Sequence, residues 1–106
     1  MLDLSSNKLI EVPNIYSFVD LRRLYLSFNR LSVLPSIERL TRLQDLDVDN
    51  NQLTSMPAMA SAHVKLKSLN VANNRLSHVD GLGACRMLER LNASGNRLED
   101  IPPETK

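Results

Sequence analysis

The sequence predicts an α/β repeat solenoid, in which short parallel strands stack into one continuous sheet. Three observations favour this fold. A unit of 22 or 23 residues recurs five times along the 106-residue chain, the chain holds 19 leucines and ten asparagines, and only 4% of its residues are aromatic. Such a period is typical of repeat architectures, in which one unit alone cannot bury its apolar side chains. The core must therefore be aliphatic and continuous from unit to unit.

The repeating unit reads L-x-x-L-x-L-x-x-N-x-L, and its second copy begins at Leu21. Four positions of the unit recur in every copy, and they are occupied by Leu2, Leu4, Asn7 and Leu9; Leu24, Leu26, Asn29 and Leu31; Leu46, Val48, Asn51 and Leu53; Leu69, Val71, Asn74 and Leu76; and Leu91, Ala93, Asn96 and Leu98. The alternation at L-x-L predicts a short strand with one face in the core. Strands that recur at this period can stack about 4.8 Å apart in a parallel sheet.

This pattern resembles the leucine-rich repeat family over nearly the whole chain. The resemblance implies a segment of a right-handed horseshoe, with a parallel β-sheet on its concave face and extended or 3₁₀ segments on its convex face. We expect a single domain, 1–106, of about five repeats, which span 1–20, 21–42, 43–65, 66–87 and 88–106, the first and last being partial. The repeat length and the turn at 79–82 are similar to those of a phosphatase-1 regulatory subunit, whereas the Leu-Pro pairs are similar to those of intracellular signalling scaffolds. Both subfamilies stay open.

One asparagine of each unit, in the turn after the strand, is predicted to be structural. Its side-chain amide has enough donors and acceptors to bridge the backbone of its own turn and that of the next. An amide buried without such partners would cost about 1 to 3 kcal/mol. We therefore expect a ladder formed by Asn7, Asn29, Asn51, Asn74 and Asn96. The glycosylation motif that begins at Asn92 is interpreted as chance, because a glycan there would obstruct the concave face.

The second half of each unit is predicted to be an extended or turn-like arc with short 3₁₀ or single-turn pieces. A proline occupies one slot of the arc in four copies, at Pro13, Pro35, Pro57 and Pro102. Apolar residues further along the arc are expected to point inward, namely Ile15, Ile37, Met59 and Leu82, followed by Phe18, Leu40 and Cys85. The third copy has one extra residue within 59–65, which we expect to bulge on the convex side. His63, in the same segment, is interpreted as a packing residue.

Functional residues are expected on the concave face, because the positions between the core leucines can vary without disturbing the core. The predicted binding face contains Arg23, Tyr25, Phe28, Asp45, Asp47, Asp49, Asn70, Arg90 and Asn92. Aspartates two positions apart on a strand, at about 6.7 Å, repel each other by about 0.6 kcal/mol in water and about 2.5 kcal/mol at an effective dielectric of 20. The favoured interpretation is a docking site for a basic segment of a protein partner, with Tyr25 and Phe28 as apolar anchors. The alternative is an ordinary solvated face.

Composition and motifs argue against several other functions. Thirteen basic and twelve acidic residues nearly cancel, so no nucleic-acid partner is expected. The chain contains no G-x-S-x-G, no phosphate-binding glycine loop and no H-E-x-x-H, so we expect no catalytic residues, no enzyme activity and no cofactor. No metal site is expected either. The run from Asp45 resembles the opening of an EF-hand loop, but Asn50 replaces its required glycine, and neither His63 nor His78 has a partner ligand.

The single cysteine and the two ends suggest where the chain belongs. Cys85 aligns with core positions and is predicted to be structural, and one cysteine excludes an internal disulfide framework, which favours a cytoplasmic location. Neither a charged-then-apolar leader nor a run of eighteen apolar residues is present, so we expect no signal peptide and no membrane partner. Neither end shows a polar cap, so flanking repeats of a longer array or self-association are expected.

The predicted function is a protein-protein interaction module, a scaffold in intracellular signalling or regulation that recruits its partner through the concave face. Two alternatives remain open. One is a structural spacer or regulatory segment of a larger phosphatase, cyclase or cytoskeletal or motor protein. The other is a fragment of a receptor ectodomain, which fits less well because such arrays usually have cysteine-rich caps.

Overall fold

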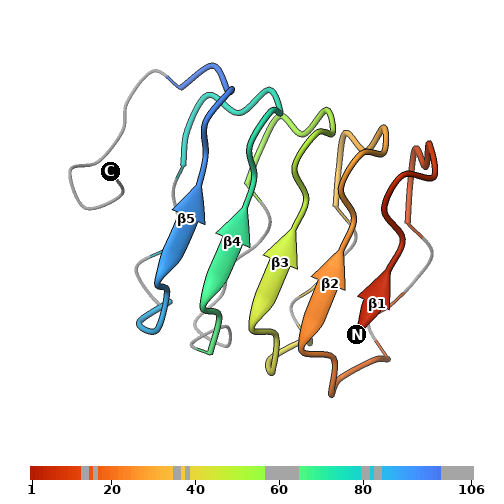
Figure 1. Ribbon diagram of the computed structural model, residues 1–106, viewed down its shortest axis with the longest axis vertical. Coiled ribbons are helices and arrows are strands. Elements are labelled where there is room, and N and C mark those ends of the chain that lie inside the picture. The colour runs from red at the N-terminus through yellow and green to blue at the C-terminus, as the bar shows by residue number, and fades with distance from the viewer. Residues whose placement is uncertain are drawn as a thin grey trace.

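The computed structural model describes residues 1–12, 15, 17–34, 37, 39–56, 65–79, 82 and 85–98. Its regular structure is one parallel β-sheet of five strands (Figure 1). The strands are β1 (Leu2–Asp3), β2 (Arg23–Tyr25), β3 (Asp45–Asp47), β4 (Ser68–Asn70) and β5 (Arg90–Asn92). They are ordered β1-β2-β3-β4-β5, so neighbours in the sheet are also neighbours in the sequence. The described residues form no helix.

Equivalent residues of successive units pair in this sheet. The register places the strand leucines in one row, which consists of Leu2, Leu24, Leu46, Leu69 and Leu91. The step from β3 to β4 is one residue longer than the other steps, yet Asp45 still pairs with Ser68 and Asp47 with Asn70. The extra residue of the third unit therefore leaves the sheet undisturbed. The segment expected to bulge, including Met59 and His63, lies outside the described residues except for Lys65.

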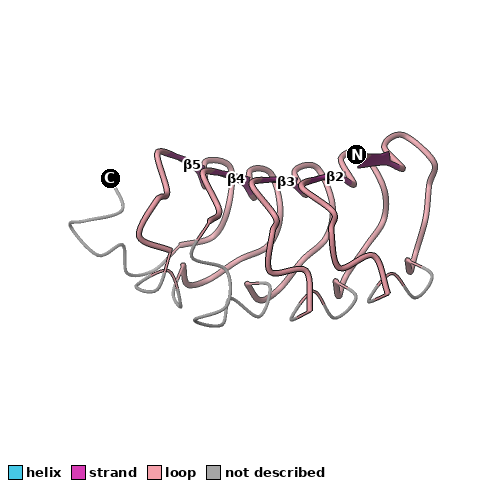
Figure 2. Cartoon of the chain, turned by 90° about the horizontal axis from the view of Figure 1, so that it is seen from below, coloured by secondary structure: helices cyan, strands magenta, loops and turns pink. Residues whose placement is uncertain are grey.

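The hydrophobic core lies between the strands and the return segments, which form opposite sides of the molecule in Figure 2. Leu24, Leu46 and Leu69 are at most 1% exposed. Complete burial of a leucine side chain stabilises a fold by about 1.5 to 3 kcal/mol. Leu2 and Leu91, in the first and last strands, are only partly buried because a strand at the edge of the sheet has a neighbour on one side.

Phe18 does not join this core, contrary to the sequence prediction. It is 49% exposed, whereas Leu40, at the equivalent place in the next arc, is fully buried. The first arc packs against one other arc only, and within it Ile15, at 2% exposed, is buried while Phe18 is not. Cys85, which fills the same place in the fourth arc, is buried as predicted.

The described parts of the arcs contain single turns and no 3₁₀ helix. The amides of Phe18, Leu40 and Cys85 each donate to the carbonyl three residues earlier at 3.0 Å. These bonds satisfy backbone groups that no strand reaches. The four arc prolines predicted to hold the chain extended, Pro13, Pro35, Pro57 and Pro102, lie outside the described residues.

Asparagine side chains tie each turn to the turn before it. The Nδ2 of Asn51 donates to the carbonyl of Leu26 in the preceding repeat at 2.9 Å and to that of Val48 in its own repeat at 3.0 Å. Its Oδ1 accepts the amide of Leu31 at 3.0 Å. The corresponding three bonds are present at Asn29, Asn74 and Asn96. These amides therefore serve two repeats at once.

The residue before each ladder asparagine has a left-handed backbone. The φ angles lie between 55° and 69° at Ser6, Phe28, Asn50, Asn73 and Gly95. This conformation costs about 1 to 2 kcal/mol for a residue that carries a Cβ, and asparagine and glycine tolerate it best. Phe28 is the one bulky side chain among the five.

Candidate protein-binding face

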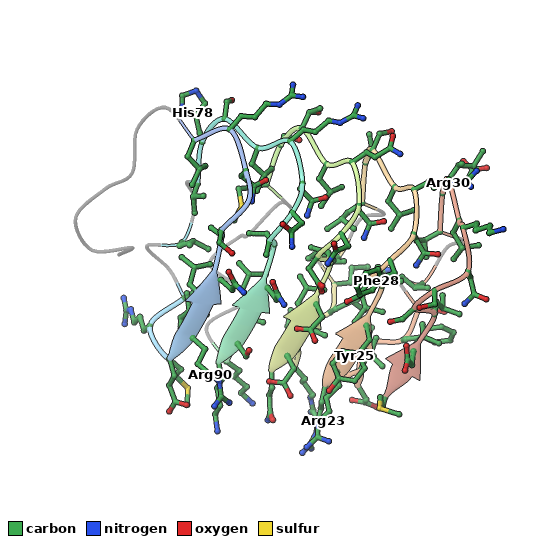
Figure 3. All side chains as sticks on the ribbon, turned by 45° about the horizontal axis from the view of Figure 1, so that its top comes forward. Arg23, Tyr25, Phe28, Arg30, His78 and Arg90 are labelled. Carbon is green, nitrogen blue, oxygen red and sulfur yellow. The ribbon has the colours of Figure 1, made fainter. Side chains whose placement is uncertain are left out.

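The structure brings the predicted acidic and aromatic residues onto neighbouring strands. Figure 3 shows Arg23, Tyr25 and Phe28 following one another along β2 and beyond its end. Asp45 and Asp47 are the first and last residues of β3, and both point away from the core because alternate residues of a strand share a side. Asp49 lies two residues beyond that strand. We call the surface formed by Arg23, Tyr25, Phe28, Asp45, Asp47 and Asp49 the acidic-aromatic face.

Arg23 compensates one of the three acids. It is the register partner of Asp45 across β2 and β3, and its Nε lies 3.5 Å from Oδ2 of that carboxylate. The two side chains are 58% and 30% exposed, so the ion pair contributes about 1 kcal/mol at most. Asp45 is therefore the least available of the three acids to a partner.

Asp49 is held in place by hydrogen bonds. One carboxylate oxygen accepts the hydroxyl of Ser27 from the preceding repeat, and the other accepts the side-chain amide of Asn50 at 2.8 Å. A carboxylate has about four acceptor positions, so Asp49 keeps capacity for a ligand. Ser27 and Asn50 were not among the predicted site residues. The recurrence of serine at positions 5, 27 and 94 was the available signal.

Asp47 is the least compensated acid of the face. Among the described residues no side chain donates a hydrogen bond to it or pairs with it. Partial burial raises the pKa of its carboxyl group above the usual value, and the charges of Asp49 and Asp45 raise this pKa further. Its register partners are Tyr25 on β2 and Asn70 on β4. A cation placed here would find a carboxylate that the protein itself leaves unpaired.

Phe28 borders the acids at the end of β2. Its amide donates to the carbonyl of Asp49 at 3.1 Å, so the two residues occupy adjacent places in neighbouring repeats. Its side chain is 59% exposed. An exposed aromatic ring is the kind of side chain that dominates binding energy in interfaces.

The remaining predicted residues lie on β4 and β5 and act differently. The Oδ1 of Asn70 accepts the amide of Ala72, and that of Asn92 accepts the amide of Ser94, both at 3.1 Å. Each asparagine thereby stabilises the turn that follows its own strand. Arg90 is exposed at the start of β5 (Figure 3) and forms no ion pair with a described residue. Arg90 and Asn92 lie on β5, beyond the acidic-aromatic face, whereas Asn70 is the register partner of Asp47 and borders that face on β4.

The described segments show neither a metal cluster nor a membrane span. Within them no three His, Cys, Asp or Glu side chains are grouped so as to hold a metal ion. They also contain no helix with the length and apolarity that crossing a bilayer requires.

A parallel sheet whose strands recur at a nearly constant spacing along the chain, with an asparagine ladder that is buried at Asn29, Asn51 and Asn74, defines a repeat solenoid. Family models agree with this class. The model described as "Leucine rich repeat" matches residues 41–98, and the model described as "Leucine Rich repeats (2 copies)" matches residues 19–61. The chain belongs to the leucine-rich repeat family. Members of this family are typically non-enzymatic and generally mediate protein-protein interaction.

Solved structures of bacterial proteins share the fold. A leucine-rich repeat protein of Leptospira interrogans superposes with a TM-score of 0.82 at 28% identity, over 98% of this chain and 26% of that one. The functional domain of InlJ from Listeria monocytogenes, which includes a cysteine ladder, gives 0.66 at 22% identity, over 94% and 26%. The leucine-rich repeat domain of a Shigella effector gives 0.61 at 22% identity, over 95% and 51%. No curated protein matches the sequence significantly.

Proposed function

We propose that this chain recruits a protein partner through the sheet side of the solenoid, and that the acidic-aromatic face is where the partner docks. The observation that carries the proposal is Asp47, a partly buried carboxylate with a raised pKa and no paired side chain among the described residues. Leaving such a group uncompensated lowers stability, and a bound cation would remove this penalty.

A basic segment of the partner fits this face best. Asp45, Asp47 and Asp49 carry three negative charges within about 14 Å, and Arg23 neutralises one of them only in part. Exposed charges of this kind steer association and add specificity. Binding is therefore expected to weaken as ionic strength rises, because the Debye length is about 8 Å at physiological salt.

Two variants with equal charge change test the site. The first replaces Asp45, Asp47 and Asp49 with asparagine, and the second replaces the exposed Glu11, Asp20 and Glu89 with their amides. Each chain is used as bait against cell extract, and retained proteins are quantified by mass spectrometry. We expect a set of proteins that wild type and the second variant retain and the first variant loses. A retained set that is the same for all three baits contradicts docking on the acids and favours the structural spacer.

Photo-crosslinking tests which side of the molecule the partner touches. A photoreactive phenylalanine analogue replaces Tyr25 on the sheet in one bait, and in the control bait it replaces Val33, which is 73% exposed in the loop after the second repeat turn. Crosslinks are expected from position 25 and not from position 33. Crosslinks from position 33 alone would place the partner on another surface.

We further propose a cytoplasmic location and a role in intracellular signalling or regulation. The buried, unpaired thiol of Cys85 supports a reducing compartment. The chain spans 26% of the length of the Leptospira protein that it resembles, so any activity of a longer protein is part of this proposal. Fractionation of cells that express the natural protein tests the location, and recovery in a membrane or secreted fraction would contradict it.

A further inference from the structure

Phe28 carries an inference that deepens the proposed function and rests on it. Its backbone is left-handed, with φ of 57°, and its side chain is 59% exposed. The equivalent positions of the following repeats hold Asn50, Asn73 and Gly95, which are residue types that tolerate this conformation. A phenylalanine at this position is thus unfavourable for the backbone and gains little from burial. Strain of this kind is a reason to look for a function.

The sheet fixes Phe28 beside a held carboxylate. Its amide donates to the backbone carbonyl of Asp49 at 3.1 Å, and the preceding Ser27 donates its hydroxyl to the carboxylate of the same residue. Asn50 holds the other carboxylate oxygen at 2.8 Å. The backbone that carries the aromatic ring and the backbone that carries the carboxylate are thereby held next to each other in neighbouring repeats.

We infer that Phe28 and Asp49 together recognise an arginine side chain of the partner. A guanidinium group is planar, stacks on aromatic faces and pairs with carboxylates, so one arginine can engage both residues. A lysine ammonium group is compact and strongly hydrated, and it stacks less well. The charge of the face therefore selects a cation, and the aromatic ring selects arginine over lysine.

The spacing of the three aspartates also indicates the backbone conformation of the bound segment. Asp45, Asp47 and Asp49 are two residues apart along and just beyond β3, at steps of about 6.7 Å. Alternate residues of an extended chain have the same spacing. The occupant is accordingly an extended segment of a partner protein that carries arginine at alternate positions.

Three synthetic hexapeptides test this inference with defined probes. They are acetylated and amidated at their ends and carry arginine, lysine or citrulline at three alternate positions, with serine between. Isothermal titration at low salt is expected to show the arginine peptide binding wild type about three to five times more tightly than the lysine peptide, and the citrulline peptide not binding. In Phe28→Asn the arginine peptide should fall to the level of the lysine peptide. Phe28→Tyr, which keeps an aromatic ring, should retain the preference.

The fold of the variant is controlled by a second measurement. Asparagine already occupies the same backbone conformation at Asn50 and Asn73, so the urea midpoint of Phe28→Asn should equal or exceed that of wild type. Equal affinity of the arginine and lysine peptides for wild type overturns the inference, as does a preference that survives in Phe28→Asn. If the arginine and lysine peptides bind wild type equally and both lose affinity for the triple aspartate variant, the proposed docking on the acids is still supported. If no peptide binds, the inference fails, and the crosslinking comparison separately decides the proposed function.

Discussion

The side-chain nitrogen of Asn51 donates a hydrogen bond to the carbonyl oxygen of Leu26, one repeat earlier, at 2.9 Å. The same nitrogen bonds the carbonyl of Val48 in its own repeat, and the side-chain oxygen accepts the amide of Leu31. One buried side chain thus satisfies backbone groups of two repeats. Stability in a solenoid comes largely from the interfaces between repeats. The ladder therefore stabilises the stacking of repeats as well as the shape of each turn.

Replacing Asn51 with alanine is expected to lower the free energy of unfolding by about 3 kcal/mol. The reason is that several buried backbone groups lose their partners, at about 1 to 3 kcal/mol each. Urea titration followed by circular dichroism measures the loss. In the matched control, Asn7→Ala, the replaced side chain is exposed and bonds the carbonyls of Leu4 and Ser5 in its own turn. The control should lose about 1 kcal/mol or less, and equal losses in the two variants would contradict the role of the ladder.

Asp47→Asn is expected to stabilise the protein at pH 7 by about 1 kcal/mol, because it removes two repulsions of about 0.6 kcal/mol each. Burial and the neighbouring acids raise the pKa of Asp47 in the folded state. A raised carboxyl pKa means that its ionisation destabilises the fold above that pKa and has no effect below the unfolded value near 3.9. The advantage of the variant should therefore be full at pH 7 and disappear as pH falls towards 3 to 4. An advantage independent of pH would show that charge is not the cause.

Asp3 provides a control of opposite sign. Hydrogen bonds from the backbone amide and the side chain of Ser5 lower the pKa of its carboxyl group. A lowered carboxyl pKa stabilises the folded state above the unfolded pKa, and this contribution is lost as pH falls through the folded value. Asp3→Asn should accordingly be neutral to destabilising at pH 7, and its difference from wild type should shrink in acid. A stabilising effect at pH 7 would reverse the sign of this relationship.

The sheet could be predicted from the sequence because its determinants are periodic. Leu24 and Leu46 occur at the same place in successive units, and only one register buries both of them. The exposure of Phe18 could not be predicted in this way, because Leu40 and Cys85 are buried at the equivalent places of later arcs, and Ile15 is buried in the same arc as Phe18. The pattern locates candidate core positions, but it does not by itself decide how deeply each one is buried.

The sequence predicts which strand positions the candidate residues occupy. It does not predict which of their side chains are already hydrogen-bonded within the protein. Alternation places Asp47 and Asn70 in equivalent positions of neighbouring strands, and the two pair in register. Their side chains nevertheless act differently, because Asn70 accepts the amide of Ala72 whereas Asp47 has no such bond among the described residues. The left-handed backbone of Phe28 is likewise a property of the turn, and it cannot be predicted from the residue type. These differences depend on side-chain directions and on local backbone angles, which the repeat period alone does not encode.

Gly95→Ala is expected to lower the free energy of unfolding by about 1 to 2 kcal/mol, because a left-handed backbone costs a residue with a Cβ about that much. Gly95 has φ of +69°, and a Cβ atom there would collide with the side-chain oxygen of Asn73. Combining Gly95→Ala with Asn73→Gly removes the colliding oxygen, so the loss caused by the alanine should be smaller in that background. A loss of the same size in both backgrounds, by urea titration, would show that the collision contributes nothing.

Cys85 is expected to be protected from thiol reagents while the protein is folded. Its side chain is 6% exposed, and burial raises the pKa of the thiol. Since the thiolate is the reactive form, both the low access and the raised pKa slow the reaction. Folded protein at pH 8 should react with Ellman's reagent at least about 100 times more slowly than the same protein in 8 M urea.

In Asn51→Ala the folded-state rate should increase if labelling requires transient opening of the stacked repeats. Wild-type labelling as fast as in urea would show that Cys85 is accessible and would contradict its place in the core.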